Sequence, residues 1–110
     1  MSFPIEQIEN FPFSKAAISC SSSGSNTILA AVAGKRYRVC AYHLTVDSTV
    51  AITWKSSTTT NLTGAMNMTQ GISVPFCEVG WFETAVGEAL TLNLSAGVQV
   101  SGCLVYQLIG

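Results

Sequence analysis

A period-two alternation of apolar and polar residues, repeated along the chain, is the strictest constraint on the fold. Residues 50–55 read Val-Ala-Ile-Thr-Trp-Lys, and residues 90–95 read Leu-Thr-Leu-Asn-Leu-Ser. Successive side chains of a strand point to opposite faces, whereas an α-helix repeats every 3.6 residues. Because several segments alternate in this way, the sequence predicts an all-β protein.

Turn-forming residues interrupt the apolar segments every eight to twelve residues, a spacing typical of a sandwich or barrel. The chain of 110 residues is long enough for one domain. We therefore predict an antiparallel β-sandwich over residues 16–110, jelly-roll-like above all. Its strands are expected at 17–21, 26–33, 36–46, 49–55, 65–68, 72–77, 81–85, 89–95 and 98–109.

Two of these strands contain an irregularity. In residues 36–46 the apolar set changes parity partway, from Tyr37, Val39 and Ala41 to Leu44 and Val46, which predicts a β-bulge near Tyr42-His43. Pro75 interrupts residues 72–77, and proline cannot donate a ladder hydrogen bond. That segment should be an edge strand or end at a bulge.

Residues 1–15 lack the alternation and are interpreted as an irregular N-terminal arm. The arm carries five large apolar side chains that need a covered environment: Phe3, Ile5, Ile8, Phe11 and Phe13. Two placements are open. The arm could fold back over an edge of its own sandwich, or it could dock on a neighbouring subunit, where aromatic anchors on a tether add contact area.

Charged residues are scarce, at 10% of the chain against about 25% in ordinary soluble proteins. An uncharged surface loses little hydration when it is pressed against another protein, so the composition favours a subunit of a larger assembly. The alternative is a β-rich monomer with a Ser/Thr surface. The net charge is −1 and the basic cluster at 35–38 is small, which argues against nucleic-acid binding. The longest apolar run, residues 28–33, is far short of the roughly 18 residues of a membrane span.

The four cysteines, Cys20, Cys40, Cys77 and Cys103, form no C-x-x-C pair, so no zinc site is predicted. The first residues show no secretory signal. We therefore expect reduced thiols that behave as small buried hydrophobes. No cofactor is expected.

Catalytic groups are few. The single histidine, His43, lies three positions from Cys40, which puts the two side chains on opposite faces of a strand. Glu78, Glu83 and Glu88 follow one another near strand ends, where acidic residues are usually solvated. We expect no enzyme, and a hydrolase using Glu78 or Glu83 is the remote alternative.

The two tryptophans are expected to differ. Trp54 shares the apolar face of its strand and belongs in the core. In Trp81-Phe82, one ring must point away from the core, either as a contact anchor or as a support under a loop. An exposed aromatic platform would also suit a sugar-binding module.

Three stretches resemble small virion proteins of tailed bacteriophages: Ala-Ala-Val-Ala-Gly-Lys-Arg-Tyr-Arg-Val at 30–39, Leu-Thr-Gly at 62–64, and Gly-Trp-Phe-Glu-Thr-Ala-Val-Gly-Glu-Ala-Leu-Thr-Leu-Asn-Leu-Ser-Ala at 80–96. The pattern is similar to the decoration (cement or staple) proteins, in particular the jelly-roll staple of short-tailed phages of the epsilon-fifteen kind. The arm matches no pattern of this family.

The resemblance implies a non-enzymatic protein, made in the bacterial cytoplasm, that sits on the outer capsid. There it would clamp neighbouring major capsid proteins and pair with itself as a homodimer or other homo-oligomer. The interface residues expected are Phe3, Ile5, Ile8, Phe11, Phe13 and Trp81. The alternative is a carbohydrate- or receptor-binding module of a tail fibre.

Overall fold

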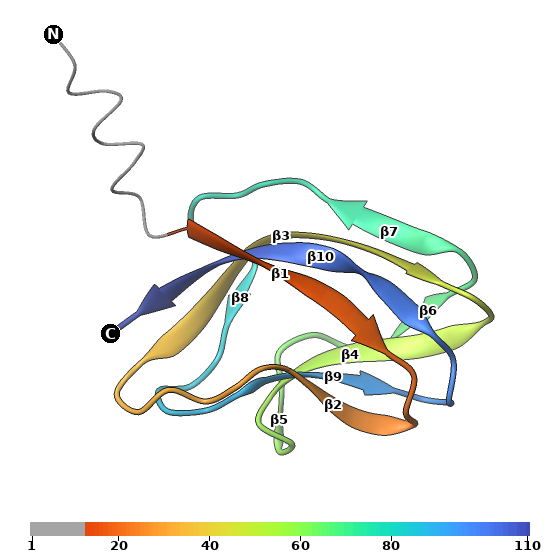
Figure 1. Ribbon diagram of the computed structural model, residues 1–110, viewed down its shortest axis with the longest axis horizontal. Coiled ribbons are helices and arrows are strands. Elements are labelled where there is room, and N and C mark those ends of the chain that lie inside the picture. Colours follow the sequence, from red (N-terminus) through yellow and green to blue (C-terminus); the bar gives the residue numbers. More distant parts are fainter. Residues whose placement is uncertain (1–12) are drawn as a thin grey trace, which may run out of the picture.

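Two antiparallel sheets lie face to face in the computed structural model, which describes residues 13–110 (Figure 1). Sheet A has the order β1 (Phe13–Cys20), β10 (Val100–Ile109), β3 (Arg36–Val46) and β7 (Gly71–Val74), with β8 (Phe82–Glu83) also paired to β3. Sheet B has the order β2 (Gly24–Leu29), β9 (Leu90–Leu94), β4 (Val50–Ser56) and β5 (Thr60–Asn61), with β6 (Met66–Met68) also paired to β4. The prediction of an antiparallel β-sandwich is confirmed.

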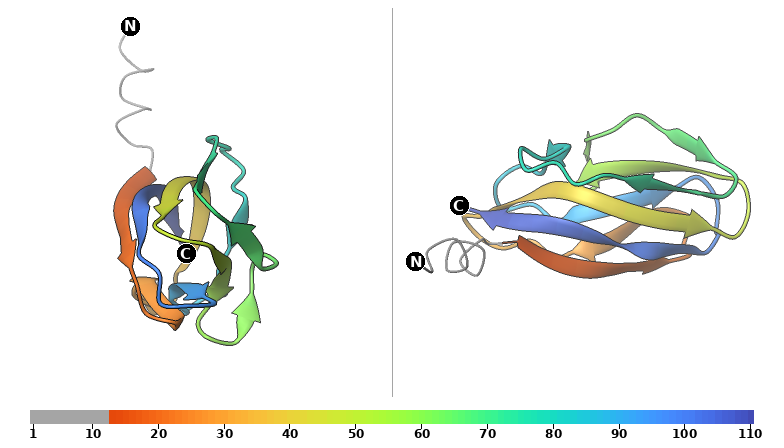
Figure 2. Two further views of the ribbon diagram at one scale, coloured as in Figure 1. Left: turned by 90° about the vertical axis from the view of Figure 1, so that its right-hand side faces the viewer. Right: turned by 90° about the horizontal axis from the view of Figure 1, so that it is seen from above.

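The connections are jelly-roll-like, because the chain repeatedly crosses from one sheet to the other. β1 lies in sheet A, β2 in sheet B, β3 in sheet A and β4 in sheet B, and β8, β9 and β10 alternate again. Figure 2 shows the two layers from the end and from above. Every pairing is antiparallel, including the long pair of β3 with β10 that forms the middle of sheet A.

The core fills the space between the layers with the inward side chains of both sheets. Trp54 in β4 is fully buried, and its ring contacts Tyr42 and Phe82 at centroid distances of 5.3 and 5.7 Å. Burial raises the pKa of the Tyr42 hydroxyl, and the indole N–H of Trp54 opposes part of that rise. The indole Nε1 has no partner at full hydrogen-bond geometry within residues 13–110. In residues 50–55 and 90–95, the alternate apolar side chains that were predicted to face the core are buried.

The predicted bulge exists, but it lies two residues earlier in the chain. In the pairing of β3 with β10, Val39 is opposite Tyr106 and Ala41 is opposite Val105, so Cys40 is the extra residue. The inward set changes there from Tyr37 and Val39 to even-numbered residues. Our placement was wrong because Ala41 was read as an inward residue, although it faces outward.

Two other details differ from the prediction, and one agrees with it. β1 begins at Phe13, so residues 13–15, which the sequence assigned to the arm, form part of sheet A. Leu108, which the alternation of residues 98–109 predicts to share the buried face, is exposed near the end of the last strand. β7 ends at Val74, directly before Pro75, and lies at the edge of sheet A, as the proline predicted.

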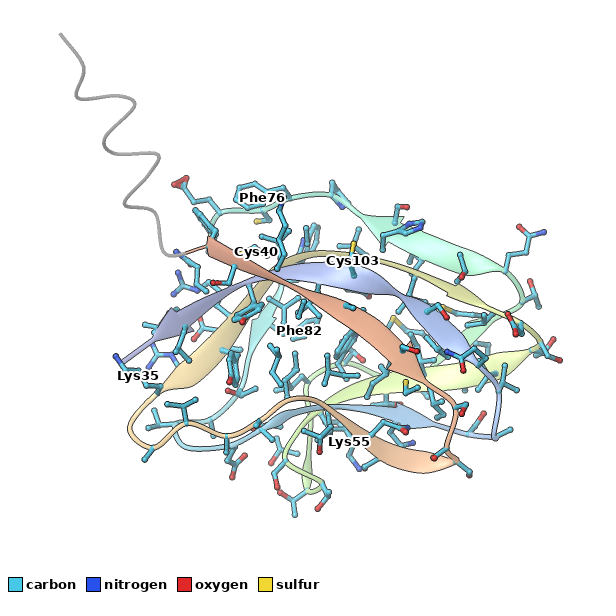
Figure 3. The ribbon with its side chains drawn as sticks, viewed as in Figure 1. Lys35, Cys40, Lys55, Phe76, Phe82 and Cys103 are labelled. Carbon is cyan, nitrogen blue, oxygen red and sulfur yellow. The ribbon has the colours of Figure 1, made fainter. Side chains whose placement is uncertain are left out.

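All four cysteines are free thiols. Burial raises the pKa of Cys40 and Cys20, which keeps both protonated. Cys103 departs from the expectation of buried cysteines because it is exposed on the outer side of sheet A, where Figure 3 labels it. Within residues 13–110, no helix is long and apolar enough to cross a membrane.

Candidate protein-contact surface

An exposed apolar loop between β7 and β8, residues 75–81, is the most distinctive surface of the described chain. Seven large apolar side chains are exposed in residues 13–110, and three of them, Phe76, Val79 and Trp81, lie in this loop. Their exposed fractions are 56%, 78% and 50%. Scattered exposed apolar residues are ordinary, but a cluster of this kind indicates a site of interaction.

Backbone hydrogen bonds to β3 hold the loop in place, and they depend on the bulge. Cys77 N donates to Cys40 O at 2.8 Å, and Trp81 N donates to Val39 O at 2.8 Å. Between these anchors, Gly80 N donates to Cys77 O at 2.9 Å and closes a turn. The loop is therefore fastened to the middle of sheet A at both of its ends.

Gly80 is required at the turn for two reasons. Its φ is +90°, a conformation that favours glycine, and an added Cβ would overlap Arg38 Cγ and lie 2.7 Å from Arg38 Cδ. The loop thus packs directly on the Arg38 side chain. Its apolar residues are presented in one fixed arrangement, which lowers the entropy lost on binding.

Trp81 borders a groove of about 430 Å³ between the edges of the two sheets. Its indole Nε1 donates to Pro75 O at 2.8 Å, which fixes the ring although half of its surface is exposed. Phe82 turns inward and packs on Tyr42 and Trp54, as its label between the sheets in Figure 3 shows. The groove is lined by Tyr42, Leu62, Thr63, Met66, Ile72, Ser73, Val74, Pro75, Trp81 and Phe82.

The structure brings two of the predicted interface residues to this loop. The rings of Phe13, at the start of β1, and Phe76 pack edge to face with centroids 5.3 Å apart. Trp81 lies at the other end of the same loop. The remaining predicted residues, Phe3, Ile5, Ile8 and Phe11, lie outside the described residues.

Sequence reasoning missed Phe76 and Val79. Phe76 continues the alternation of Ile72 and Val74 and was therefore assigned to a strand, but the strand ends before Pro75. The usable signal was the pair of Pro75 and Gly80, which together bracket a short loop rich in apolar residues.

A small ion-pair network lies beside the loop. Arg36 Nε and Arg38 Nε contact the two carboxylate oxygens of Glu83 at 2.9 and 2.7 Å. Arg38 also donates from Nη1 to Gln107 Oε1 at 3.2 Å. The hydrogen bond from Arg38, with the charges of both arginines, lowers the pKa of the Glu83 carboxyl.

The Glu83 network predicts a small pH-dependent stability. A carboxyl whose pKa is lowered by folding contributes stability above its unfolded pKa, and this contribution is lost as the pH falls through the folded value. Because the pair is one-third exposed, we expect less than about 1 kcal/mol. Unfolding in urea at pH 7 and at pH 3 should show that Glu83→Gln is less stable than the wild type at pH 7, and that this deficit is smaller at pH 3. An equal deficit at both pH values would contradict this.

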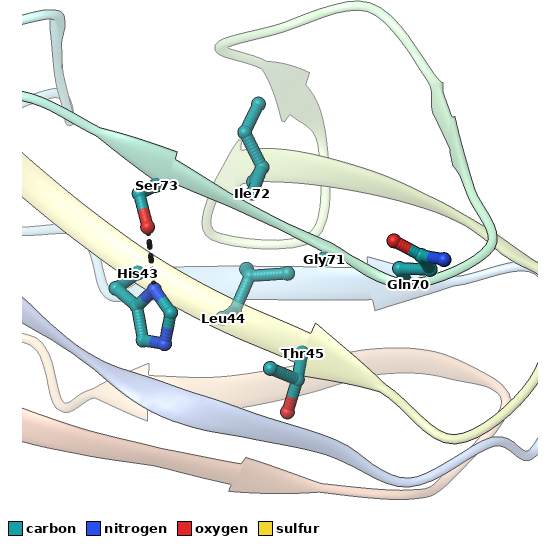
Figure 4. Close-up of a pocket in the computed structure, with 7 residues that line it drawn as sticks. All are labelled: His43, Leu44, Thr45, Gln70, Gly71, Ile72 and Ser73. Carbon is teal, nitrogen blue, oxygen red and sulfur yellow. Dashed lines mark hydrogen bonds between the residues drawn. The ribbon is translucent and has the colours of Figure 1, made fainter.

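The candidate catalytic groups occupy structural positions. His43 Nδ1 lies 2.7 Å from Ser73 Oγ across β3 and β7 (Figure 4), while Cys40 is buried at the bulge. Glu88 accepts a hydrogen bond from Ser56 Oγ, and Glu83 is held by the arginines. A general acid needs a raised pKa, and that of Glu83 is lowered. No cluster of metal-ligating side chains occurs within residues 13–110.

Comparisons with protein-family models, with curated proteins and with solved structures found no match to this chain. The resemblance to phage decoration proteins therefore rests on the three sequence stretches alone.

Proposed function

We propose that this protein is a non-enzymatic structural component of a bacteriophage virion that decorates the outer capsid and clamps neighbouring major capsid proteins. The observation that carries the proposal is the exposed apolar loop at 75–81. Phe76, Val79 and Trp81 project from a backbone that is hydrogen-bonded to β3 at both ends. An aromatic side chain beside a preformed groove is a typical interface anchor.

The composition supports the same proposal. Few ionised groups have to be dehydrated when such a surface meets another protein. A protein that binds an assembled shell, and not its separate subunits, stabilises the shell by mass action. The specific assignment to phage capsids comes from the resemblance of residues 30–39, 62–64 and 80–96.

The test is co-sedimentation of the purified protein with expanded capsids that lack their decoration protein, from a panel of short-tailed phages. We expect saturable binding by the wild type. Trp81→Ala should weaken it by about 2 kcal/mol or more, about 30-fold, as for other aromatic anchors. Val86→Ala is the control, because Val86 is 56% exposed, close to the 50% of Trp81, but lies outside the loop. Absence of binding to every capsid in the panel would refute the proposal.

A second function is favoured by one observation. Trp81 has its indole fixed by Pro75 O beside a groove whose lining also includes Thr63 and Ser73. Such a platform could stack on a sugar ring, as in a receptor-binding module of a tail fibre. A glycan array separates the two functions. Sugar binding that disappears in Trp81→Ala, together with no binding to capsids, would favour the tail-fibre module.

A further inference from the structure

The outer face of sheet A carries apolar residues at one end, here called its apolar end, among Lys15, His43 and Ser73, and it is polar at the other end. Across the sheet, the register aligns Ala17 with Cys103 and Cys103 with His43, and it aligns Lys15 with Val105 and Val105 with Ala41. The row at the far end instead consists of Ser19, Ser101, Thr45 and Gly71. The apolar end is the end at which β1 begins.

This apolar end is hollowed and accessible in the described chain. A depression of about 260 Å³ lies over β3, β7 and β10, and its rim includes Ala41, His43, Ser73, Pro75, Cys103 and Val105. Cys103 and Ala17 are exposed. Figure 3 places Cys103 and Phe76 on this outer side, away from sheet B.

The twelve residues that precede β1 are connected to the sandwich at the apolar end of this face, where β1 begins. Phe13 directly follows them in the chain, and its ring packs on Phe76 beside the depression. Cys103 is opposite Ala17, four residues along β1 from Phe13, which is about 13 Å. Twelve extended residues reach about 40 Å. The segment can therefore lie over the whole apolar end of the face.

The composition of the segment complements the face. It contains four large apolar side chains, Phe3, Ile5, Ile8 and Phe11, and two carboxylates, Glu6 and Glu9. The face presents Lys15, which forms no ion pair within residues 13–110. An apolar segment with two negative charges thus precedes a strand that carries Lys15 on the same face as the apolar hollow.

We propose that residues 1–12 pack on the outer face of sheet A of their own chain and cover the depression between β3, β7 and β10. Tethering favours the same chain over a second copy, because it gives the segment an effective concentration in the millimolar range. The inference rests on this face and not on the proposed function, since the capsid contact assigned to Trp81 lies in the loop.

The test uses the exposed thiol of Cys103 as a reporter. In the background Cys20→Ser and Cys77→Ser, Cys103 is the accessible thiol, because Cys40 is buried. Labelling by a water-soluble maleimide should be on the order of tenfold slower in the full chain than in the same chain without residues 1–12. The deletion leaves β1 intact. Circular dichroism checks the fold, and equal labelling rates in folded proteins would overturn the proposal.

A disulfide trap distinguishes whether the segment that covers this face belongs to the same chain or to a second copy. Ile8→Cys in the same background, oxidised at low protein concentration, should form a disulfide with Cys103 within one chain. The product would be a monomer of altered mobility on a non-reducing gel. Ser22→Cys, in the β1–β2 turn at the other end of β1, is the control and should remain reduced. Disulfide-linked dimers would show that the segment covers a second copy and would overturn the same-chain assignment.

Discussion

Replacing Trp54 by alanine should lower the free energy of unfolding by about 3–5 kcal/mol, the usual cost of removing a buried aromatic ring. Trp54 is fully buried and contacts the rings of Tyr42 and Phe82 between the two sheets. Its removal would leave a cavity where the two layers meet. Urea denaturation followed by circular dichroism measures the change.

Two variants give this experiment its controls. Trp81→Ala removes a ring of the same size that is half-exposed, so it should cost about 1 kcal/mol, mainly its hydrogen bond to Pro75 O. Trp54→Phe keeps a ring and removes an N–H that lacks a well-aligned partner, so it should cost less than Trp54→Ala. If Trp54→Ala and Trp81→Ala were equally destabilising, the assignment of Trp54 to the core would be wrong.

Replacing Gly102 by alanine should destabilise the fold by about 2–3 kcal/mol, although it adds a single methyl group. Gly102 lies in β10 opposite Leu44 of β3. A Cβ there would overlap the carbonyl oxygen of His43 and lie 2.7 Å from Leu44 Cα. Both obstacles are backbone atoms of the central strand, so relief requires the two strands to separate.

Gly64→Ala is the matched control for Gly102→Ala. A Cβ at Gly64 meets nothing within 4 Å, so this variant should be as stable as the wild type in the same urea titration. A neutral result for Gly102→Ala would contradict the close approach of β10 and β3 that the pairing requires.

The layers of the fold could be predicted because one face of the long inner strands β3, β4 and β9 is buried. The alternation in residues 50–55 and 90–95 fixed which side chains face the core, and Pro75 correctly marked the end of an edge strand. Alternation becomes ambiguous where both faces carry apolar residues. Ala41 and Cys40 are both small and apolar, so the sequence located the bulge only approximately.

The candidate surface was less predictable, because it depends on contacts between distant residues. Sequence singled out Trp81 but could not place its indole against Pro75 O, nor Phe13 against Phe76. Both contacts follow from the way the loop is hydrogen-bonded to Val39 and Cys40. That arrangement depends on the bulge, whose exact position no local pattern defines.

The central claim is that the loop at 75–81 is the surface through which this protein meets its partner. Hydrogen exchange of the amides of this loop, measured in the free protein and after mixing with the capsid panel, tests it most directly. The account predicts that the exposed amides at 76, 78 and 79 exchange more slowly on the capsid, while the polar outer row at Ser19 and Thr45 is unchanged. If the protein bound capsids and the loop exchanged as in the free state, or if no capsid altered its exchange, the claim would be contradicted.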